Sequence, residues 1–356
     1  MYDRRNVTGF HSTLASMASL SPKLNIHPND AILSGPERGM PQTRFLRQST
    51  YPRASTFHFV NPFLMRTSLT VIACSSILAS VQAADSEPID LSKVDKSGYH
   101  LFNPTPREYM REMSTDRPDK TESAYTVDAG HFQIEMDFFT YTRDRDTRDG
   151  ADTQVDAWAV APINFKMGLF NSVDLQTVIE TYNHVETDDR VAGTKTRQTG
   201  FGDVTSRLKV NFWGNDGGPT ALAVMPYVKY PTNQDKLGNN SVEGGIIVPL
   251  AIELPAGFGM GVMPQFDFVR NEDRDGHHTE FVNTITVGHS LVGDLGMYVE
   301  FFSAVSTEDD SPWVGTVDLG FTYGLTPDIQ LDAGVNIGVT DSADDVNPFL
   351  GISLRF

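Results

Sequence analysis

The sequence is poor in cysteine, in basic residues and in long apolar runs, and each shortage excludes a class of protein. Its 356 residues include one cysteine, which excludes a disulfide framework and a Cys-ligated structural metal site. Lys and Arg number 28 against 46 Asp and Glu, and they form no long basic stretch, so nucleic-acid binding is excluded. Gly and Pro are frequent but not periodic, which excludes collagen-like repeats.

The charge changes sign along the chain. Residues 1–83 hold eight Lys or Arg and three Asp or Glu. The remainder holds 20 basic and 43 acidic residues, a net charge of −23 against −18 for the whole chain. Such a change indicates two segments that are processed differently.

A signal peptide explains this boundary. Met65-Arg66 begins a short basic start, an apolar stretch from Leu69 to Ala79 follows, and Val81-Gln82-Ala83 has the small residues of a cleavage site. The apolar stretch is too short and too interrupted for a spanning helix, which needs about 20 residues. We therefore predict a signal peptide at 65–83. Residues 1–64 are expected to precede the true start or, alternatively, to form a disordered leader.

The exported chain divides at about residue 130. Residues 84–130 are polar and broken by prolines, and they are expected to form an N-terminal periplasmic segment or a plug. From His131, segments of about ten residues alternate apolar and polar, which is typical of a transmembrane β-barrel. The first segment shows the pattern, with Phe132, Ile134 and Met136 alternating with Gln133 and Glu135.

Twelve such segments predict an all-β, up-and-down antiparallel transmembrane barrel over 131–356. Links after the even-numbered segments are short, and links after the odd-numbered ones, such as 143–153 and 185–202, are mostly longer and charged. Outer-membrane barrels have short periplasmic turns and longer external loops, so this alternation of short and long links supports the fold. The expected strands are 131–142, 154–167, 173–184, 203–213, 220–230, 242–254, 257–269, 279–291, 295–306, 313–325, 328–339 and 348–356.

The C-terminus adds an independent signal. Leu350, Ile352, Leu354 and Phe356 alternate to the last residue, and the chain ends on an aromatic. This ending is similar to the signal that the outer-membrane barrel-assembly machinery reads. We expect that machinery to be a partner and the cell outer membrane, with its lipid and lipopolysaccharide, to be the location.

A resemblance to a known family begins at residue 115. Thr115-Asp116-Arg117-Pro118-Asp119, then Thr121-Glu122-Ser123, then Gly130 to Glu135 resemble the opening motif of the exported barrel family labelled "putative MetA-pathway of phenol degradation". Lys120 departs from the apolar or aromatic residue usual there. The resemblance covers about residue 115 to the end. It implies an outer-membrane transporter, linked to phenol catabolism by association, with no catalytic residues to carry over.

If the apolar faces meet lipid, the opposite faces line a lumen. One interpretation is a polar conduit for small solutes by passive diffusion, biased by its acidic charge. The other is an interior filled by salt bridges, because twelve strands lie between the filled and the open barrel sizes. The expected lumen residues are Glu135, Asp137, Asp156, Lys166, Asp174, Glu180, Arg207, Lys209, Lys229, Asp267, Glu300, Asp318, Asp332 and Arg355.

Glycines on the inward faces raise a second question. These glycines leave room for another backbone or a ligand, and they are Gly259, Gly261, Gly320, Gly324, Gly334, Gly338 and Gly351. The Pro-rich segment 99–130 would then enter the barrel and gate it. Alternatively, these glycines relieve strand curvature or accept aromatic neighbours such as Tyr298.

Other functions have weaker support. A non-conducting barrel that binds lipid or a partner through its acidic loops is one alternative. An outer-membrane lipid hydrolase is another, but His289 and Ser290 are adjacent and point to opposite strand faces, so a nucleophile–base pair is missing. No cofactor, metal site or catalytic residue is expected, because P-loop, Rossmann and zinc signatures are absent from the sequence.

Overall fold

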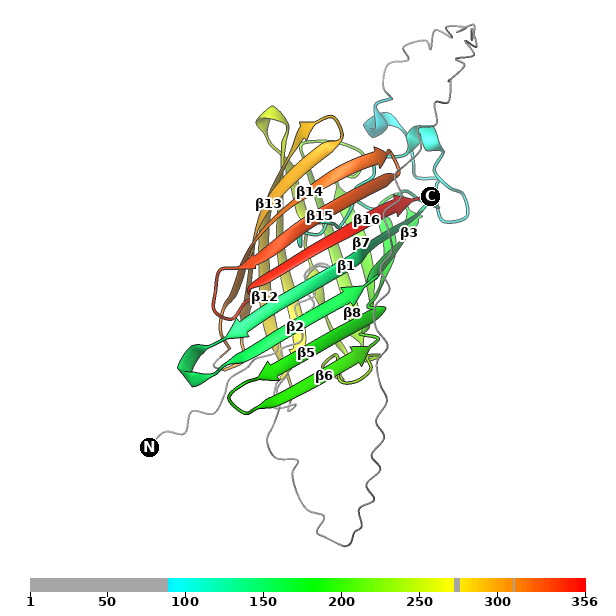
Figure 1. The fold of residues 1–356 in the computed structure, drawn as a ribbon. Helices are drawn as coiled ribbons and strands as arrows, with labels where there is room; N and C mark the ends of the chain where they lie inside the picture. The colour runs from blue at the N-terminus through cyan, green and yellow to red at the C-terminus, as the bar shows by residue number, and fades with distance from the viewer. Residues whose placement is uncertain (1–88, 272–275, 310) are drawn as a thin grey trace, which may run out of the picture. The chain divides into compact units, whose positions relative to one another are not determined.

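The computed structural model describes residues 89–271, 276–309 and 311–356, which all belong to one compact unit (Figure 1). The predicted leader 1–64 and signal peptide 65–83 lie outside the described residues. Within those residues, no helix is long and apolar enough to cross a bilayer. The helices are short 3-10 turns, η1 (Leu91–Lys93), η2 (Arg107–Tyr109), η3 (Arg148–Gly150) and η4 (Pro255–Gly257).

The remaining regular structure is one antiparallel sheet. In its first half, the strands are β1 (Phe132–Asp146), β2 (Thr153–Val160), β3 (Ile163–Phe170), β4 (Val173–Ile179), β5 (Tyr182–Asp189), β6 (Thr194–Gly200), β7 (Val204–Trp213) and β8 (Thr220–Tyr230). In its second half, they are β9 (Glu243–Ile247), β10 (Leu250–Glu253), β11 (Phe258–Arg270), β12 (His277–Val292), β13 (Leu295–Ser306), β14 (Val314–Thr326), β15 (Ile329–Gly338) and β16 (Val346–Arg355).

The sheet closes into a barrel because β16 pairs with β1. The amide of Phe132 and the carbonyl of Phe356 lie 2.9 Å apart, as do the amide of Phe356 and the carbonyl of Phe132. Four spans are each broken into two strands, β2 with β3, β4 with β5, β6 with β7, and β9 with β10. The barrel therefore has twelve spans, and the predicted all-β barrel is confirmed. We call the rim that holds Phe132 and Phe356 the terminal rim, and the opposite one the loop rim.

Side-chain alternation separates the two faces of the wall. In β12, Glu280, Val282 and Thr284 are buried, whereas Phe281 and Ile285 are exposed. Successive side chains of a strand point to opposite faces, so the first set faces the lumen and the second faces outward. The same pattern around the barrel gives an apolar exterior that matches a lipid environment.

Four neighbouring spans change face at one level, which the sequence did not predict. Strand pairing brings Phe138, Ala161, Thr181 and Gly202 side by side, and the strands are irregular at each of them. Ala161 has a left-handed backbone (φ 53°) and precedes Pro162, which has no N–H to donate. The Thr181 hydroxyl lies 2.6 Å from the Val160 carbonyl. We call this line the seam.

The seam reverses one predicted lumen residue. A change of register by one residue exchanges the inward and outward faces of a strand. Between the seam and the loop rim, Val155 and Ala157 are therefore buried on the inside, whereas Asp156 is half-buried on the outward face. The Tyr141 hydroxyl donates to the Asp156 carboxylate at 2.5 Å. Asp156 thus departs from the expected lumen position, although Lys166, below the seam on the same span, is fully buried.

Two predicted loops are partly strand. The link expected at 143–153 is shortened because β1 continues to Asp146, and the link expected at 185–202 is mostly β5 and β6. Both hairpins carry opposite charges on facing strands. Arg197, for example, pairs with Glu186 at 2.8 Å. Such pairs stabilise a ladder that exposes charge on its outer face, so a charged sequence forms strands here.

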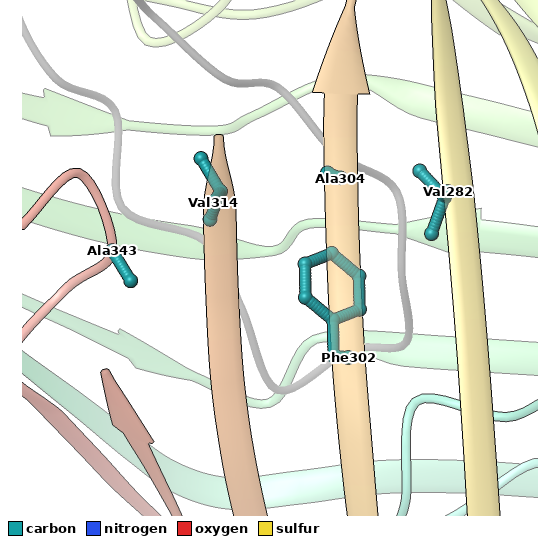
Figure 2. Packing of buried hydrophobic residues seen from close by; sticks show 5 residues of the cluster. All are labelled: Val282, Phe302, Ala304, Val314 and Ala343. Carbon is teal, nitrogen blue, oxygen red and sulfur yellow. The ribbon is translucent and has the colours of Figure 1, made fainter. Parts of the chain in front are cut away.

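Apolar clusters also face the lumen, so the interior is not polar throughout. Val282 of β12, Phe302 and Ala304 of β13, and Val314 of β14 pack together with Ala343 from the β15–β16 link (Figure 2). Two further clusters lie on other parts of the inner wall. One contains Val155, Ala157, Val185 and Leu237, and the other contains Met225, Tyr227, Ile247 and Met263.

Gly214, in the turn after β7, gives a test of the fold. Its φ is +83°, and a Cβ there would lie 2.1 Å from the Thr220 carbonyl oxygen. We expect Gly214→Ala to lower the free energy of unfolding by roughly 1–3 kcal/mol, because backbone atoms cannot rotate away. Urea unfolding in detergent, followed by heat-modifiable migration, measures it. Gly259→Ala in β11 is the control, since no atom lies within 4 Å of the added Cβ. Equal stability of both variants would contradict this packing.

Candidate functional site

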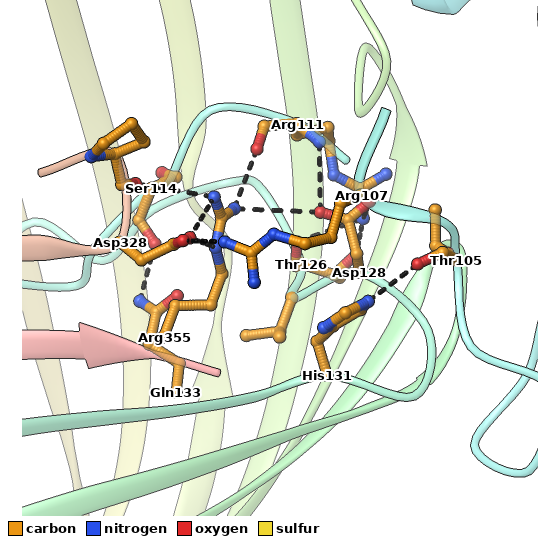
Figure 3. A network of polar contacts seen from close by, with 12 residues as sticks. Thr105, Arg107, Arg111, Ser114, Thr126, Asp128, His131, Gln133, Asp328 and Arg355 are labelled. Atoms are coloured by element: carbon orange, nitrogen blue, oxygen red, sulfur yellow. Dashed lines mark hydrogen bonds and ion pairs between the residues drawn. The ribbon is translucent and has the colours of Figure 1, made fainter. Parts of the chain in front are cut away.

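The chain enters the barrel through a polar network at the terminal rim (Figure 3). Arg107 of η2 pairs with Asp328 in the β14–β15 turn, and Arg355 of β16 pairs with the same carboxylate at 2.8 Å. Arg355 also donates to the Arg111 carbonyl at 2.8 Å. These pairs join the N-terminal segment to the last strand and to a turn of the wall.

Arg111 and Asp128 form a neck between the incoming and outgoing chain. The Arg111 amide donates to the Asp128 carboxylate at 3.1 Å, and the two side chains lie 3.3 Å apart. The Arg111 guanidinium also donates to the Thr126 carbonyl at 3.2 Å. Residues 112–127 therefore form a loop whose two ends are tied together at the terminal rim. We call it the lumen loop.

A second set of ion pairs fixes the neck to the wall. Arg111 and Lys96 both contact Asp216 in the β7–β8 turn, at 2.8 and 2.6 Å. Burial alone would raise the pKa of Asp216, but hydrogen bonds from Lys96 and Asn171 and the charge of Arg111 lower it below its ordinary value. Asp216 is therefore ionised at neutral pH, when it holds both cations.

The acidic side chains of the lumen loop meet a basic part of the wall. Asp116 lies 2.6 Å from both Lys166 of β3 and Lys209 of β7. Glu122 lies 2.6 Å from Arg207, also of β7. All five side chains are buried, so each charge depends on its partner for compensation.

The basic side chains of the lumen loop meet an acidic part of the wall. Arg117 lies 2.6 Å from both Asp137 of β1 and Asp332 of β15. Lys120 lies 3.0 Å from Asp318 of β14, and its ammonium stands 4.5 Å from the centre of the Phe302 ring. The wall is therefore polarised, with its cations on β3 and β7, where Glu135 and Asp174 accompany them, and carboxylates alone facing Arg117 and Lys120 on β1, β14 and β15.

Hydrogen bonds from uncharged donors complete the contact. The Thr121 hydroxyl donates to Glu300 of β13 at 2.6 Å and lies 2.6 Å from the Thr284 hydroxyl of β12. The Lys120 amide donates to the same Glu300 carboxylate at 2.7 Å. On the other side, the Val127 amide donates to Asp174 of β4 at 3.0 Å. The lumen loop thus contacts spans around the barrel.

The expected lumen residues fall into three groups. Glu180, Lys229 and Asp267 are buried in the wall, where Lys229 pairs with Glu243 and Asp267 accepts from Tyr227 at 2.5 Å. Asp156 faces outward, as described above. The others contact the lumen loop or its neck, and they are Glu135, Asp137, Lys166, Asp174, Arg207, Lys209, Glu300, Asp318, Asp332 and Arg355.

Four of the inward glycines serve the two purposes considered from the sequence. A Cβ at Gly351 would lie 2.2 Å from the Arg117 guanidinium, and one at Gly261 would lie 2.8 Å from the Thr121 side chain. These two make room for the lumen loop. A Cβ at Gly320 would instead lie 2.4 Å from the Tyr298 ring, and one at Gly334 would lie 2.5 Å from the Phe349 ring and 2.9 Å from the Tyr298 hydroxyl. Those two accept an aromatic neighbour.

The sequence indicated segment 99–130 as a possible plug, but it did not identify the charged residues of the lumen loop as partners of the wall. The signal was the alternation of sign in Asp116-Arg117 and Lys120-Thr121-Glu122. Alternating charges in an extended segment reach different sides of a narrow space, and here they meet opposite parts of the polarised wall.

The residues considered for other chemistry lie elsewhere. His289 contacts the Ala256 carbonyl at 3.2 Å, and its ring packs at a tilt against Phe258, with the centroids 4.3 Å apart, near the terminal rim. In the described ranges, no group of three or more His, Cys, Asp or Glu side chains is arranged to hold a metal ion.

One family of known proteins matches most of the barrel and the lumen loop. Residues 115–356 match the family described as "Putative MetA-pathway of phenol degradation", and the chain belongs to that family. No curated protein matches the chain.

Several solved barrels align with part of this chain. The COG4313 outer membrane channel from Pseudomonas putida F1 has 10% identity and a TM-score of 0.49, over 64% of this chain and 95% of that one. The NanC porin has 11% identity and a TM-score of 0.40, over 63% and 100%. A mutant of the TodX monoaromatic hydrocarbon channel has 9% identity and a TM-score of 0.37, over 74% and 99%.

Arg117 provides a test of the lumen contacts. Arg117→Met leaves Asp137 and Asp332 buried without their cation, a loss of about 3–5 kcal/mol if the lumen loop stays in place. We expect the loop to leave the wall instead, and trypsin to cut after Lys120, which is buried in the intact protein.

The matched control for this test is Arg197→Met on the outer surface. Arg197 is 64% exposed and pairs with Glu186, so its loss is expected to change stability by less than about 1 kcal/mol and to leave Lys120 protected. Equal protection of Lys120 in both variants would contradict the role assigned to Arg117.

Proposed function

We propose that the protein is an outer-membrane channel that passes small solutes by passive diffusion and has no enzymatic role. One observation carries the proposal. The lumen is occupied by a polar loop that is tied to the wall at one rim and held by ion pairs, rather than by a continuous apolar core. The wall is closed by its own strand pairing, so displacement of the loop leaves the barrel intact.

The orientation follows from the two rims. Short turns and both ends of the barrel mark the periplasmic side of outer-membrane barrels, so the terminal rim faces the periplasm. The lumen loop then enters from the periplasm, and the charged hairpins face outward, beside lipopolysaccharide. Leu350 and Phe356 are exposed on the exterior of the last span, where the assembly machinery can read Leu350, Ile352, Leu354 and Phe356 during insertion.

The lumen loop is the gate in this proposal. With the loop in place, the side chains at the middle of the lumen are paired and buried. With the loop displaced, Lys166, Lys209 and Arg207 face a solute from one side, and Asp137 and Asp332 face it from the other. Fixed charges of opposite sign orient a dipolar solute, and the acidic excess disfavours anions.

The inner wall also favours a particular class of solute. The apolar clusters on β12–β14 and on β8, β9 and β11 lie on the same wall as the charged groups. A small solute with an apolar ring and one polar group matches both surfaces. The family description names phenol degradation, which supports an aromatic solute of this kind.

The closed lumen also favours a second candidate, a non-conducting barrel that binds lipid or a partner at its surface. In that case the lumen loop is a permanent part of the interior. The two candidates differ in whether the loop moves, and a reversible cross-link distinguishes them.

A disulfide between Thr121→Cys and Thr284→Cys, made with Cys74→Ser, tests the gate. The two hydroxyl oxygens lie 2.6 Å apart, which is compatible with a disulfide. We expect the oxidised protein in a planar bilayer to stay closed and the reduced protein to show conducting steps, because only the reduced loop can leave Glu300.

Each single-cysteine variant is the control, since it changes one hydroxyl and cannot form the cross-link. Its conductance is expected to be the same with and without reductant. Identical steps from the oxidised and reduced double variant would exclude the gate, and no steps under any condition would favour the non-conducting barrel.

The solute class is tested by making the inner wall more polar. Val282→Thr keeps the side-chain shape, Ile247→Thr also removes the terminal methyl group, and each removes apolar contact from one cluster. We expect vesicles carrying the protein to take up phenol about fourfold more slowly per substitution, since a methyl-sized contact is worth about 0.8 kcal/mol. Uptake of glycerol is expected to be unchanged, and an equal slowing of both solutes would exclude apolar selection.

A further inference from the structure

A short turn outside the lumen presents an exposed aromatic side chain. Residues 98–103 lie at the terminal rim, before the chain reaches the neck. Phe102 there is 88% exposed, the highest value for a large apolar residue in the described part of the chain. A large apolar side chain that is exposed to water gains no free energy from burial. Its neighbours therefore show what surrounds it.

The turn is held firmly, so the position of Phe102 is fixed. The amide of His100 donates to the Asn103 carbonyl at 3.0 Å, and the amide of Asn103 donates back to the His100 carbonyl at 2.8 Å. The Phe102 amide donates to the His100 ring at 3.2 Å. The turn is fastened to the wall because the Leu101 amide donates to the Leu169 carbonyl, in β3, at 2.9 Å.

Strand geometry shows which way Phe102 faces. His100 forms an antiparallel bridge with Phe170, the last residue of β3, so the two side chains share one face of the wall. Phe170 is 56% exposed and faces outward. Phe102 lies in the two-residue turn that connects His100 to Asn103, and its ring lies edge-on 6.4 Å from the His100 ring, beside that outward face.

The outward face at this rim is already aromatic. β4 separates β3 from β7, and β7 ends in Phe212 and Trp213, which are 62% and 50% exposed. With Phe170, they continue the apolar exterior of the barrel to its edge. Aromatic side chains at such an edge lie at the level of lipid headgroups.

We propose that Phe102 inserts into the phospholipid interface of the inner leaflet and anchors the N-terminal segment there. This inference rests on the proposed placement of the barrel in the outer membrane. The anchor precedes the neck in the chain, so it keeps the base of the lumen loop at the rim when the loop leaves the lumen. Its occupant is the bilayer, because the turn extends the lipid-facing surface.

A fluorescent side chain at position 102 tests the anchor. Phe102→Trp is made in the full chain with the native Trp158, Trp213 and Trp313 changed to Phe, and the protein is reconstituted in phosphatidylcholine vesicles. We expect blue-shifted emission that acrylamide quenches weakly. Lipids brominated near the glycerol backbone are expected to quench it strongly.

Two controls separate the possible outcomes. Lys93→Trp lies in the same segment, on a side chain that is 80% exposed, and is expected to be quenched by acrylamide and not by brominated lipid. Phe281→Trp, on the outward face of β12, is expected to be quenched by lipid brominated deeper in the chains. If Phe102→Trp behaves like Lys93→Trp while Phe281→Trp is quenched by lipid, the anchor is wrong. If Phe281→Trp is not quenched by lipid, the membrane placement fails and the anchor fails with it.

Discussion

The compensation of buried charge between the lumen loop and the wall is the constraint on which the rest of the structure depends. Asp116 and Glu122 lie against Lys166, Lys209 and Arg207, and Arg117 lies against two carboxylates. Without the loop, the wall keeps ions that only water can solvate, and without the wall the loop has no fold of its own. The two parts are therefore matched, and a lumen that loses the loop must fill with water.

The neck holds both ends of the lumen loop at one rim of the barrel. Arg111 and Asp128 tie both ends of the lumen loop at the terminal rim, where Asp216 and Asp328 hold the surrounding cations. The barrel closes through backbone pairing of β1 with β16 and does not need the loop for closure. Movement of the loop therefore exchanges ion pairs for hydration without breaking the wall, which connects the closed lumen to the proposed conduction.

The sequence predicted the fold well because alternation with period two continues through most spans, as in Phe281 against Glu280 and Val282. It failed for Asp156, because the change of face at the seam depends on the backbone of Ala161 and its neighbours, which alternation does not reveal. It predicted the charged residues of the lumen wall but not their partners. Which side of the barrel Asp116 or Arg117 meets is a property of the closed structure. The apolar clusters were missed because Val282 and Phe302 share a face with carboxylates.

Single-channel recording from a protein in which a short Gly-Ser linker replaces residues 113–126 tests the central claim most directly. Arg111 and Asp128 are adjacent in space, so a short linker joins them without straining the neck. A gate formed by the lumen loop predicts larger and more persistent conductance steps than those of the unaltered protein, with the heat-modifiable migration of a folded barrel. The same steps from both proteins, or none from either, would contradict it.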